Sequence, residues 1–278
     1  MPPLRRRRGA PRWVTLSTDL GAAYAAQMKA VLAHRLPPGT VVDLAHDLPP
    51  HGVREAGFVV RAMAERFPAG SVHVVVVDPG VGGQRASVAI ACRDGSVLVG
   101  PDNGVLAPLA EALGGGRAYR LDPARLASSP RVGTTFDGRD VFAPAAALLA
   151  SGVRPSRLGS PTAILRASPS PPLREAHGAR GSIAHVDRFG NLVTNVPTDW
   201  LPREVAVLQV RIGARNLRLP LVRSYEARAT GRFAVLGSSF GSLEVARVQG
   251  RAADRLGAGV GTSVRFAWSV RPVRRKRK

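Results

Sequence analysis

Hydrophobic residues along the first half of the chain alternate between short continuous runs and longer stretches with helical spacing. The run at 72–77 (VHVVVV) is apolar at almost every position, which is typical of a strand in a sheet covered on both faces. The stretch at 22–35 combines helix formers with apolar residues at helical spacing. Further strands are expected at 13–17, 41–44, 87–91 and 97–99, and further helices at 53–67 and 142–149. Because strands and helices alternate, this part is predicted to be an α/β layered domain.

The pattern changes after residue 165. The segment 166–180 is rich in Pro, Ser and Ala and has no periodicity, which indicates a linker. Beyond it, turn residues separate short runs typical of strands, at 181–186, 205–212, 217–221, 233–236, 242–246 and 263–266. We therefore predict an N-terminal α/β domain at 12–165 and a smaller, antiparallel and barrel-like β domain at 181–270.

The chain is strongly basic, with a formal net charge of +21 from 40 Lys and Arg residues against 19 Asp and Glu residues. Such a balance is typical of nucleic-acid-binding proteins. The basic residues are scattered, however, and they cluster only in two predicted tails, 1–11 and 271–278. Because basic tails are commonly solvated, we do not expect nucleic acid to be a partner. The alternative is salt-dependent nucleic-acid binding through these tails.

Several other classes of protein are not expected. No apolar run approaches the ~18–20 residues of a membrane span, and the basic N-terminus lacks the apolar stretch of a secretory signal. The single cysteine, Cys92, excludes an internal disulfide and agrees with a reducing compartment. We expect a cytoplasmic protein with no membrane partner.

Four polar segments that contain glycine each follow a predicted strand, at 17–21 (STDLG), 77–82 (VDPGVG), 100–104 (GPDNG) and 134–140 (TTFDGRD). Open α/β sheets bind their ligands beyond the strand ends, so carboxylates in these loops are candidates for ligand binding. The alternative is that the Asp-Gly and Asn-Gly pairs only make turns. Four such segments, none of them a plain two-residue hairpin turn, favour the functional interpretation.

Common catalytic motifs are missing from the sequence, including the phosphate-binding loop, the dinucleotide-binding glycine motif, the serine-nucleophile elbow and HExxH. His46 and His51 share one loop, but we expect ordinary loop histidines and no metal site. In the second part, 186–195 (VDRFGNLVTN) combines amides, a carboxylate and an aromatic ring. An Asn side chain offers the paired donor and acceptor that an adenine edge requires, and Phe189 or Tyr225 offers a stacking face.

Taken in order, these segments resemble the S-adenosylmethionine hydroxide adenosyltransferase family, which is related to fluorinating and chlorinating enzymes. The resemblance extends from 13 to 266 and rests on STDLG, VDPGVG with Arg85 seven residues after Asp78, GPDNG, TFDGRDVFAP, VDRFGNLVTN and GSSFGSLEVA. It implies hydrolysis of S-adenosylmethionine to adenosine and methionine without a cofactor. It also implies a homotrimer in which the N-terminal domain of one subunit and the C-terminal domain of its neighbour hold the substrate.

The resemblance assigns substrate contacts to five residues. Asp19 matches the carboxylate that binds both ribose hydroxyls. Asp187 matches the group that meets the methionine amine, and Ser239 the group that meets its carboxylate. Asn191 matches the amide that reads adenine, and Tyr225 falls where an aromatic ring stacks on the base.

The nucleophilic water is held by an Asp-Arg-His set in the hydrolysing members of the family. Asp78 and Arg85 match the first two positions, but Asp137 stands where the family motif TFHGRD has His. Two carboxylates beside one arginine still offer hydrogen-bond partners to a water. Alternatively, Asp137 turns away and Asp78 with Arg85 suffice, or the chain binds adenosine or S-adenosylmethionine without turnover. Halide transfer is disfavoured, because two carboxylates repel an anion.

Overall fold

The computed structural model describes residues 12–126, 133–164 and 171–269, and both predicted basic tails lie outside these ranges. The chain divides into two compact units, Met1–Ser168 and Pro169–Lys278. No helix in the described part combines the length and the apolar character needed to span a membrane.

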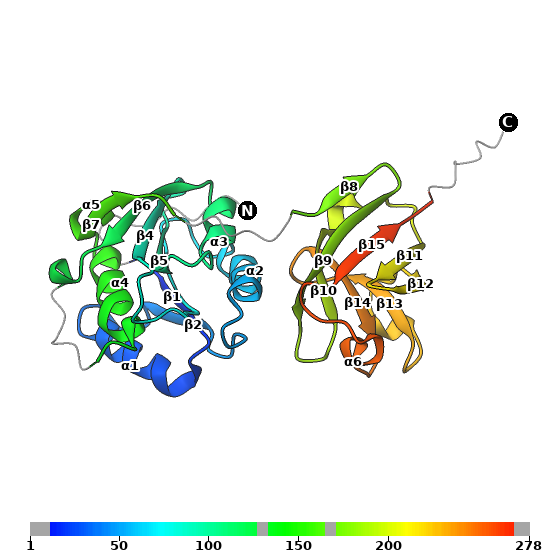
Figure 1. The fold of residues 1–278 in the computed structure, drawn as a ribbon, viewed down its shortest axis with the longest axis horizontal. Helices are drawn as coiled ribbons and strands as arrows, with labels where there is room; N and C mark the ends of the chain where they lie inside the picture. The colour runs from blue at the N-terminus through cyan, green and yellow to red at the C-terminus, as the bar shows by residue number, and fades with distance from the viewer. Residues whose placement is uncertain (1–11, 127–132, 165–170, 270–278) are drawn as a thin grey trace. The chain divides into compact units, whose positions relative to one another are not determined.

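A seven-stranded mixed sheet forms the centre of the first unit, in the order β2-β1-β3-β5-β4-β6-β7 (Figure 1). Its strands are β1 Val14–Thr18, β2 Val41–Ala45, β3 Val72–Val76, β4 Ser87–Cys92, β5 Val97–Pro101, β6 Gly116–Leu121 and β7 Gly159–Thr162. The first four strands in this order are parallel, and the remaining pairings are antiparallel. The carboxyl ends of β1, β3 and β5 therefore meet at one edge of the sheet.

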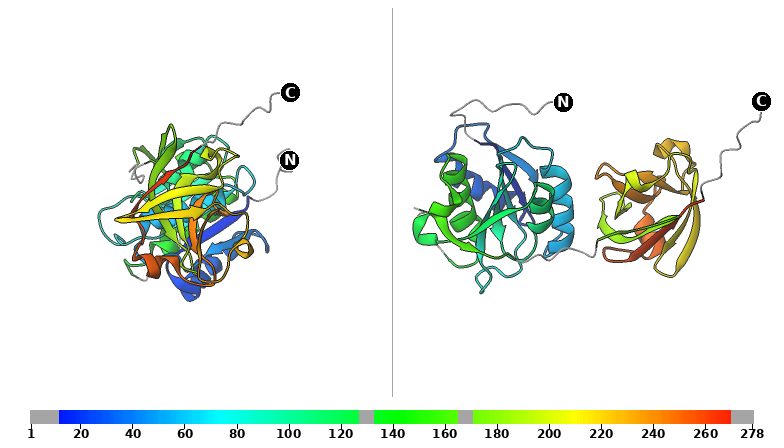
Figure 2. Two further views of the ribbon diagram at one scale, coloured as in Figure 1. Left: turned by 90° about the vertical axis from the view of Figure 1, so that its right-hand side faces the viewer. Right: turned by 90° about the horizontal axis from the view of Figure 1, so that it is seen from above.

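Helices cover both faces of this sheet, as the views in Figures 1 and 2 show. They are α1 Gly21–Ala33, α2 Val53–Ala64, α3 Ala107–Ala112, α4 Ala143–Ala150, α5 Pro155–Leu158 and the short turn η1 Pro123–Arg125. Met28 and Leu32 of α1 pack with α4 against Val14 and Leu16 of β1. All five residues of β1 are buried, because a parallel strand covered on both faces contacts no solvent.

An unusual turn precedes α4. The segment η2, Gly138–Phe142, is a π-helix, and the backbone N–H of Ala143 donates to the carbonyl oxygen of Gly138 five residues earlier. Such single π turns within helices are frequent at functional sites. The helix expected at 142–149 is present as α4. The motif around Asp137 was expected to follow a strand, but among the described residues it instead begins a helical segment.

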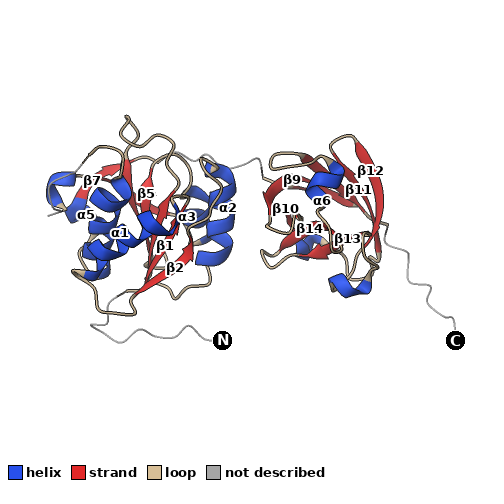
Figure 3. Ribbon diagram, turned by 90° about the horizontal axis from the view of Figure 1, so that it is seen from below, coloured by secondary structure: helices blue, strands red, loops and turns tan. Residues whose placement is uncertain are grey.

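Strands are the main regular elements of the second unit, and its helices are short, as the colouring in Figure 3 makes clear. Its antiparallel order is β12-β11-β15-β9-β10-β14-β13, and β8 pairs with β9. The strands are β8 Leu173–Glu175, β9 Gly178–Val186, β10 Leu192–Pro197, β11 Val207–Ile212, β12 Arg215–Pro220, β13 Phe233–Gly237, β14 Ser242–Arg247 and β15 Ser263–Ala267, with the short helices η3 Thr198–Trp200, η4 Tyr225–Ala227 and α6 Ala252–Leu256. A bridge between Leu221 and Val235 brings its two ends together, so the unit is a nearly closed barrel.

The predicted fold class, an α/β unit followed by a barrel-like β unit, is confirmed. Three strands of the barrel differ from expectation. β8 and the start of β9 occupy part of the segment expected to be a linker, and β10 was not expected. β10 contains Thr194 and Asn195, whose polar side chains mask a strand pattern. Thr194 is fully buried and donates to the carbonyl oxygen of Leu243 at 2.7 Å, which satisfies its hydroxyl inside the barrel.

Candidate active site

Asp78 and Arg85 form a bidentate ion pair just beyond the end of β3. The Nε atom of Arg85 donates to Oδ1 of Asp78 at 3.0 Å, and its Nη2 atom donates to Oδ2. The Nη1 atom donates to the hydroxyl of Ser87 at 2.9 Å, and the guanidinium lies over the ring of Phe142. Because every nitrogen of the guanidinium has a partner, Arg85 is fixed in one orientation.

Asp137 joins this pair from the helical segment that leads into α4. Its Oδ2 atom accepts a hydrogen bond of 2.6 Å from Nη2 of Arg85. The side chains of Asp78, Arg85 and Asp137 are only 4%, 13% and 9% exposed, so one arginine pairs with two buried carboxylates. Burial opposes the charge on Arg85, but the hydrogen bonds to both carboxylates outweigh it and raise the pKa of the guanidinium. The alternative in which Asp137 turns away is not what the structure shows.

Glycine allows the two loops of this cluster to approach. Gly82 has a φ of +76°, and a Cβ atom there would lie 3.0 Å from the carbonyl oxygen of Thr134. A side chain at this position would therefore be strained in conformation and would push the loops apart. The contact explains how residues 78 and 137 meet although no strand among the described residues leads directly into the second loop.

The segment 100–104 braces the same loop. Asn103 donates from Nδ2 to the carbonyl oxygen of Val77 at 2.9 Å, and its Oδ1 atom accepts from the backbone of Val105. This asparagine therefore supports the residue before Asp78 and closes its own turn. The segment 100–104 thus supports the segment 77–82 through the side chain of Asn103.

Asp19 lies at the end of β1, the strand next to β3, and its backbone N–H donates to the carbonyl oxygen of Val76. Its Oδ2 atom accepts from the backbone N–H of His51 at 3.1 Å. Its Oδ1 atom is buried and has no hydrogen-bond partner within the described chain. Since a buried carboxylate oxygen without a donor is costly, this atom is suited to receive a hydroxyl from a ligand.

A second polar cluster lies in the barrel and contains three of the predicted residues. Asp187 accepts backbone hydrogen bonds from Phe189 and Asn191 on Oδ1, at 2.9 and 2.8 Å. Its Oδ2 atom accepts from the side-chain amide of Asn191 at 2.9 Å. The same amide lies 3.5 Å from the hydroxyl of Tyr225. The structure thus brings Asp187, Asn191 and Tyr225 together.

Glu244 is a member of this cluster that sequence analysis missed. It lies in β14, is 4% exposed, and accepts a hydrogen bond of 2.5 Å from the hydroxyl of Tyr225. Burial and the nearby charge of Asp187 raise the pKa of Glu244, although the bond from Tyr225 opposes this. Burial and the contact with Glu244 likewise raise the pKa of Tyr225 above its ordinary value. A single acidic residue within the apolar strand run 242–246 was the available signal in the sequence.

The remaining two predicted residues are exposed. Phe189 is 69% exposed, and Ser239 lies in the exposed turn between β13 and β14. The backbone N–H of Phe189 contacts the cluster through its bond to Asp187. The side chains of Phe189 and Ser239 are accessible from solvent.

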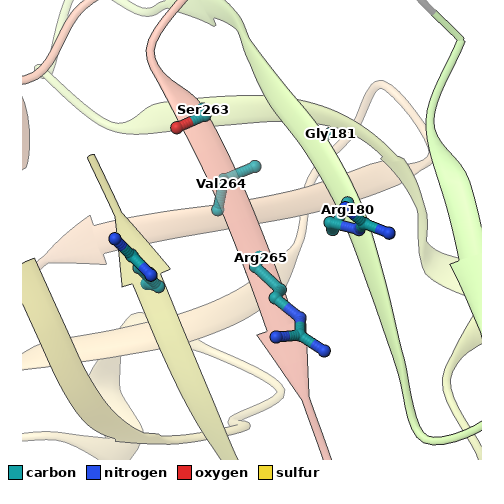
Figure 4. A pocket seen from close by; sticks show the side chains of 6 residues that line it. Arg180, Gly181, Ser263, Val264 and Arg265 are labelled. Carbon is teal, nitrogen blue, oxygen red and sulfur yellow. The ribbon is translucent and has the colours of Figure 1, made fainter. Parts of the chain in front are cut away.

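The barrel also carries an arginine-lined groove of about 280 Å³, away from the predicted residues (Figure 4). Arg180, Arg265 and Arg211 lie opposite one another on adjacent strands. Glu175 contacts two of them, at 2.5 Å from Arg180 and 2.9 Å from Arg265, and the Arg265 and Arg180 contacts lower its pKa. Arg211 donates to the carbonyl oxygen of Gly213. The guanidinium groups are thus partnered within the protein.

The two units define a two-domain protein that pairs a sheet-edge cluster of carboxylates and arginine with a β-barrel bearing a carboxylate-amide cluster. The family model for the SAM hydroxide adenosyltransferase N-terminal domain matches residues 14–159, and the model for the C-terminal domain matches 181–265. The chain therefore belongs to the SAM hydroxide adenosyltransferase family, as its sequence motifs predicted.

Individual proteins support the same assignment. The chain is 39% identical to a protein of Salinispora tropica over 91% of this chain and 97% of that protein, and 42% identical to one of Thermus thermophilus over 87% and 94%. Both relatives are named (R)-S-adenosyl-L-methionine hydrolase. More distant matches are named fluorinase. A solved structure of an uncharacterized conserved protein from Thermotoga maritima has a TM-score of 0.84 and 30% identity, covering 91% of this chain and 99% of that one.

Proposed function

We propose that the protein hydrolyses S-adenosylmethionine to adenosine and L-methionine. A water oxygen forms a bond to ribose C5′ while the C5′–S bond breaks, and the bonding electron pair leaves with sulfur to give the neutral thioether of methionine. The water loses one proton to a carboxylate and then to solvent. Since the sulfonium is already a good leaving group, the reaction needs neither a general acid nor a cofactor.

The observation that carries this proposal is the buried Asp78–Arg85–Asp137 cluster at the edge of the sheet. Two carboxylates oriented by one guanidinium are acceptors for both hydrogens of a water. Holding the water in line with C5′ converts a bimolecular encounter into a positioned one. The same carboxylates repel fluoride or chloride, so the cluster supports hydrolysis over halide transfer.

We assign substrate contacts to the two other groups of residues. Asp19, with its buried unpartnered oxygen, binds the ribose hydroxyls. Asn191 and Tyr225 bind the adenine, with Phe189 as a further aromatic surface, and Ser239 meets the methionine carboxylate. Asp187 binds the methionine amine, because its two oxygens offer about four acceptor positions and its own loop uses three.

The decisive experiment incubates the full chain with S-adenosylmethionine in the absence of halide and measures adenosine and methionine together. Equal amounts of both products are expected, and Asp78→Asn should abolish their formation. Binding of the substrate without either product would instead identify a non-catalytic binding protein. Formation of a 5′-halogenated nucleoside when fluoride or chloride is added would favour halide transfer.

We further propose a homotrimer in which Asp19 and Asp187 of one active site come from different subunits. The support is the family resemblance and the location of the two residues in separate units. The mass in solution should be three times the chain mass of 29.3 kDa. Mixing Asp19→Ala and Asp187→Ala subunits by reversible dissociation should restore about a quarter of wild-type activity, because some cyclic interfaces contain neither substitution. Two inactive variants that never complement each other would contradict the shared site.

A further inference from the structure

A chain of polar side chains leads from α1 to the residue next to Asp19. Lys29 of α1 donates to Oδ2 of Asp43 at 2.9 Å. The Oδ1 atom of Asp43 lies 3.0 Å from Nε2 of His46. The Nδ1 atom of His46 lies 3.1 Å from the hydroxyl of Thr18, which is the last residue of β1 and is fully buried.

One arrangement of protons is compatible with these contacts. A neutral imidazole has one donor nitrogen and one acceptor nitrogen. Nε2 lies close to Asp43 without the geometry of a hydrogen bond, and with a proton on Nε2, His46 can accept the hydroxyl proton of Thr18 on Nδ1. The Thr18 oxygen is then available to accept the backbone N–H of Leu20, which lies at 3.3 Å. A carboxylate beside one ring nitrogen favours the proton on that nitrogen, and so favours Nδ1 as the acceptor.

Backbone hydrogen bonds also connect the loop of His46 to the end of β1. The N–H of Gly21 donates to the carbonyl oxygen of His46 at 2.9 Å, and the N–H of Leu48 donates to the carbonyl oxygen of Thr18 at 3.2 Å. His51, which donates its N–H to Asp19, has a φ of 62°. A left-handed conformation is uncommon for a residue other than glycine and often marks a functional site.

We propose that His46 and Asp43 are positioning residues that hold Asp19, through Thr18, in the orientation that binds the ribose hydroxyls. This inference rests on the proposed function, which gives Asp19 that role. One oxygen of Asp19 is fixed by His51, and the other is buried and open to a ligand. A carboxylate used in this way must be oriented before the ligand arrives, since each misaligned hydrogen bond weakens binding.

The charges along this series of side chains are consistent with the proposed positioning role. Burial works against ionisation of Asp43, but its contacts with Lys29 and His46 outweigh burial and hold the pKa of that carboxyl below its ordinary value. Asp43 therefore stays a negatively charged neighbour of His46. The side chain of His46 is only 15% exposed, whereas those of Asp43 and Lys29 are 44% and 40% exposed. This series of side chains thus extends from solvent to the buried hydroxyl of Thr18.

The test compares calorimetric binding of adenosine and of 2′,3′-dideoxyadenosine to the full chain, because only adenosine has the hydroxyls that Asp19 is proposed to bind. Thr18→Val and His46→Ala should each weaken adenosine binding about tenfold, while binding of the dideoxynucleoside changes less than about twofold. Thr18→Ser keeps the hydroxyl and should restore most of the preference for adenosine.

Thr15→Val is a matched control. Thr15 lies in the same strand, is 1% exposed, and its hydroxyl lies 2.8 Å from Nδ1 of another histidine, His73. It should lower stability as Thr18→Val does, yet leave the preference for adenosine unchanged. An equal loss of preference in Thr15→Val would overturn the inference, because the effect would then be a general weakening of β1.

The result also separates this inference from the proposed function. If wild type does not prefer adenosine over the dideoxynucleoside, or if Asp19→Ala leaves that preference intact, the role of Asp19 is wrong. If Asp19→Ala removes the preference but Thr18→Val and His46→Ala retain it, Asp19 binds the ribose without help from His46, and the inference alone is wrong.

Discussion

The Nη2 atom of Arg85 donates a hydrogen bond of 2.6 Å to Oδ2 of Asp137, a residue 52 positions further along the chain. The same nitrogen contacts Asp78, so both carboxylates share one donor group. A histidine in place of Asp137 would bring a neutral or positive ring to this point. The protein therefore surrounds its proposed water with more negative charge than the family motif does.

The first prediction concerns catalysis by Asp137. Asp137→Ala should lower kcat about 100-fold, because a positioned proton acceptor contributes on this scale, and should leave KM for S-adenosylmethionine nearly unchanged. Steady-state release of adenosine, measured from pH 5 to about pH 9, checks this. Wild-type kcat in Asp137→Ala would show that Asp78 and Arg85 suffice. Asp137→His then tests whether the family residue functions equally well in this environment.

The second prediction concerns stability. Arg85→Ala leaves two carboxylates buried without their cation and should lower the free energy of unfolding by about 3–5 kcal/mol. Arg125→Ala is the control, because it lies in the same unit and its pair with Asp122 is 51% and 43% exposed and should contribute only about 0–1 kcal/mol. Urea unfolding followed by the helical circular dichroism signal reports on the first unit. Equal losses in both variants would contradict the buried role of Arg85.

The third prediction concerns pH. Burial lowers the pKa of His73 from 6.5 to about 4, with a small opposing effect from Asp94. The folded protein therefore binds this proton less well than the unfolded chain, so stability is fully present above pH 6.5 and is lost as the pH falls toward 4. The loss amounts to about 3 kcal/mol.

His73→Gln, which does not titrate, isolates this effect. Between pH 7 and about pH 4, wild type should lose about 3 kcal/mol more stability than His73→Gln, as measured by urea unfolding at each pH. Parallel pH curves for the two proteins would mean that the folded protein binds the His73 proton as readily as the unfolded chain does. The comparison cancels the contribution of other titrating groups.

The fourth prediction concerns Tyr225 and Glu244 in the barrel. Glu244→Ala removes the acceptor that fixes the tyrosine hydroxyl and should weaken adenosine binding about tenfold, because the ring must be ordered on binding. Glu244→Gln keeps an acceptor oxygen and should retain affinity within about twofold. Titration calorimetry with adenosine checks both variants. Loss of affinity in Glu244→Gln would instead indicate that the ligand requires the carboxyl group itself.

Residues in buried strands and amphipathic helices were predictable, because burial imposes a periodicity that can be read directly. The predicted strand at 72–77 corresponds to β3, and the helix at 53–67 corresponds to α2. β7 was not predictable in this way, since its Gly, Ser, Pro and Thr residues are typical of turns and are tolerated only because β7 is an edge strand.

The residues of the candidate site also differ in how far the sequence indicated them. Asp78 and Arg85 lie in one loop, but the sequence indicated their joint role only through the family resemblance. Motif resemblance alone linked Asp137 to them, since nothing in its local sequence specifies a partner 52 residues away. The roles of His46 and Glu244 depend on contacts with Thr18 and Tyr225, and no pattern of spacing reports such contacts.

The π turn at Gly138–Phe142 makes the position of Asp137 depend on the number of residues between it and α4. An α-helix advances by about 100° per residue. Deleting one residue within the turn would restore regular α-helical hydrogen bonding and rotate everything before it by that angle relative to α4. Asp137 would then face away from Arg85 although every residue of the proposed catalytic cluster was still present. In this protein, the length of this segment therefore carries functional information that residue identity alone does not.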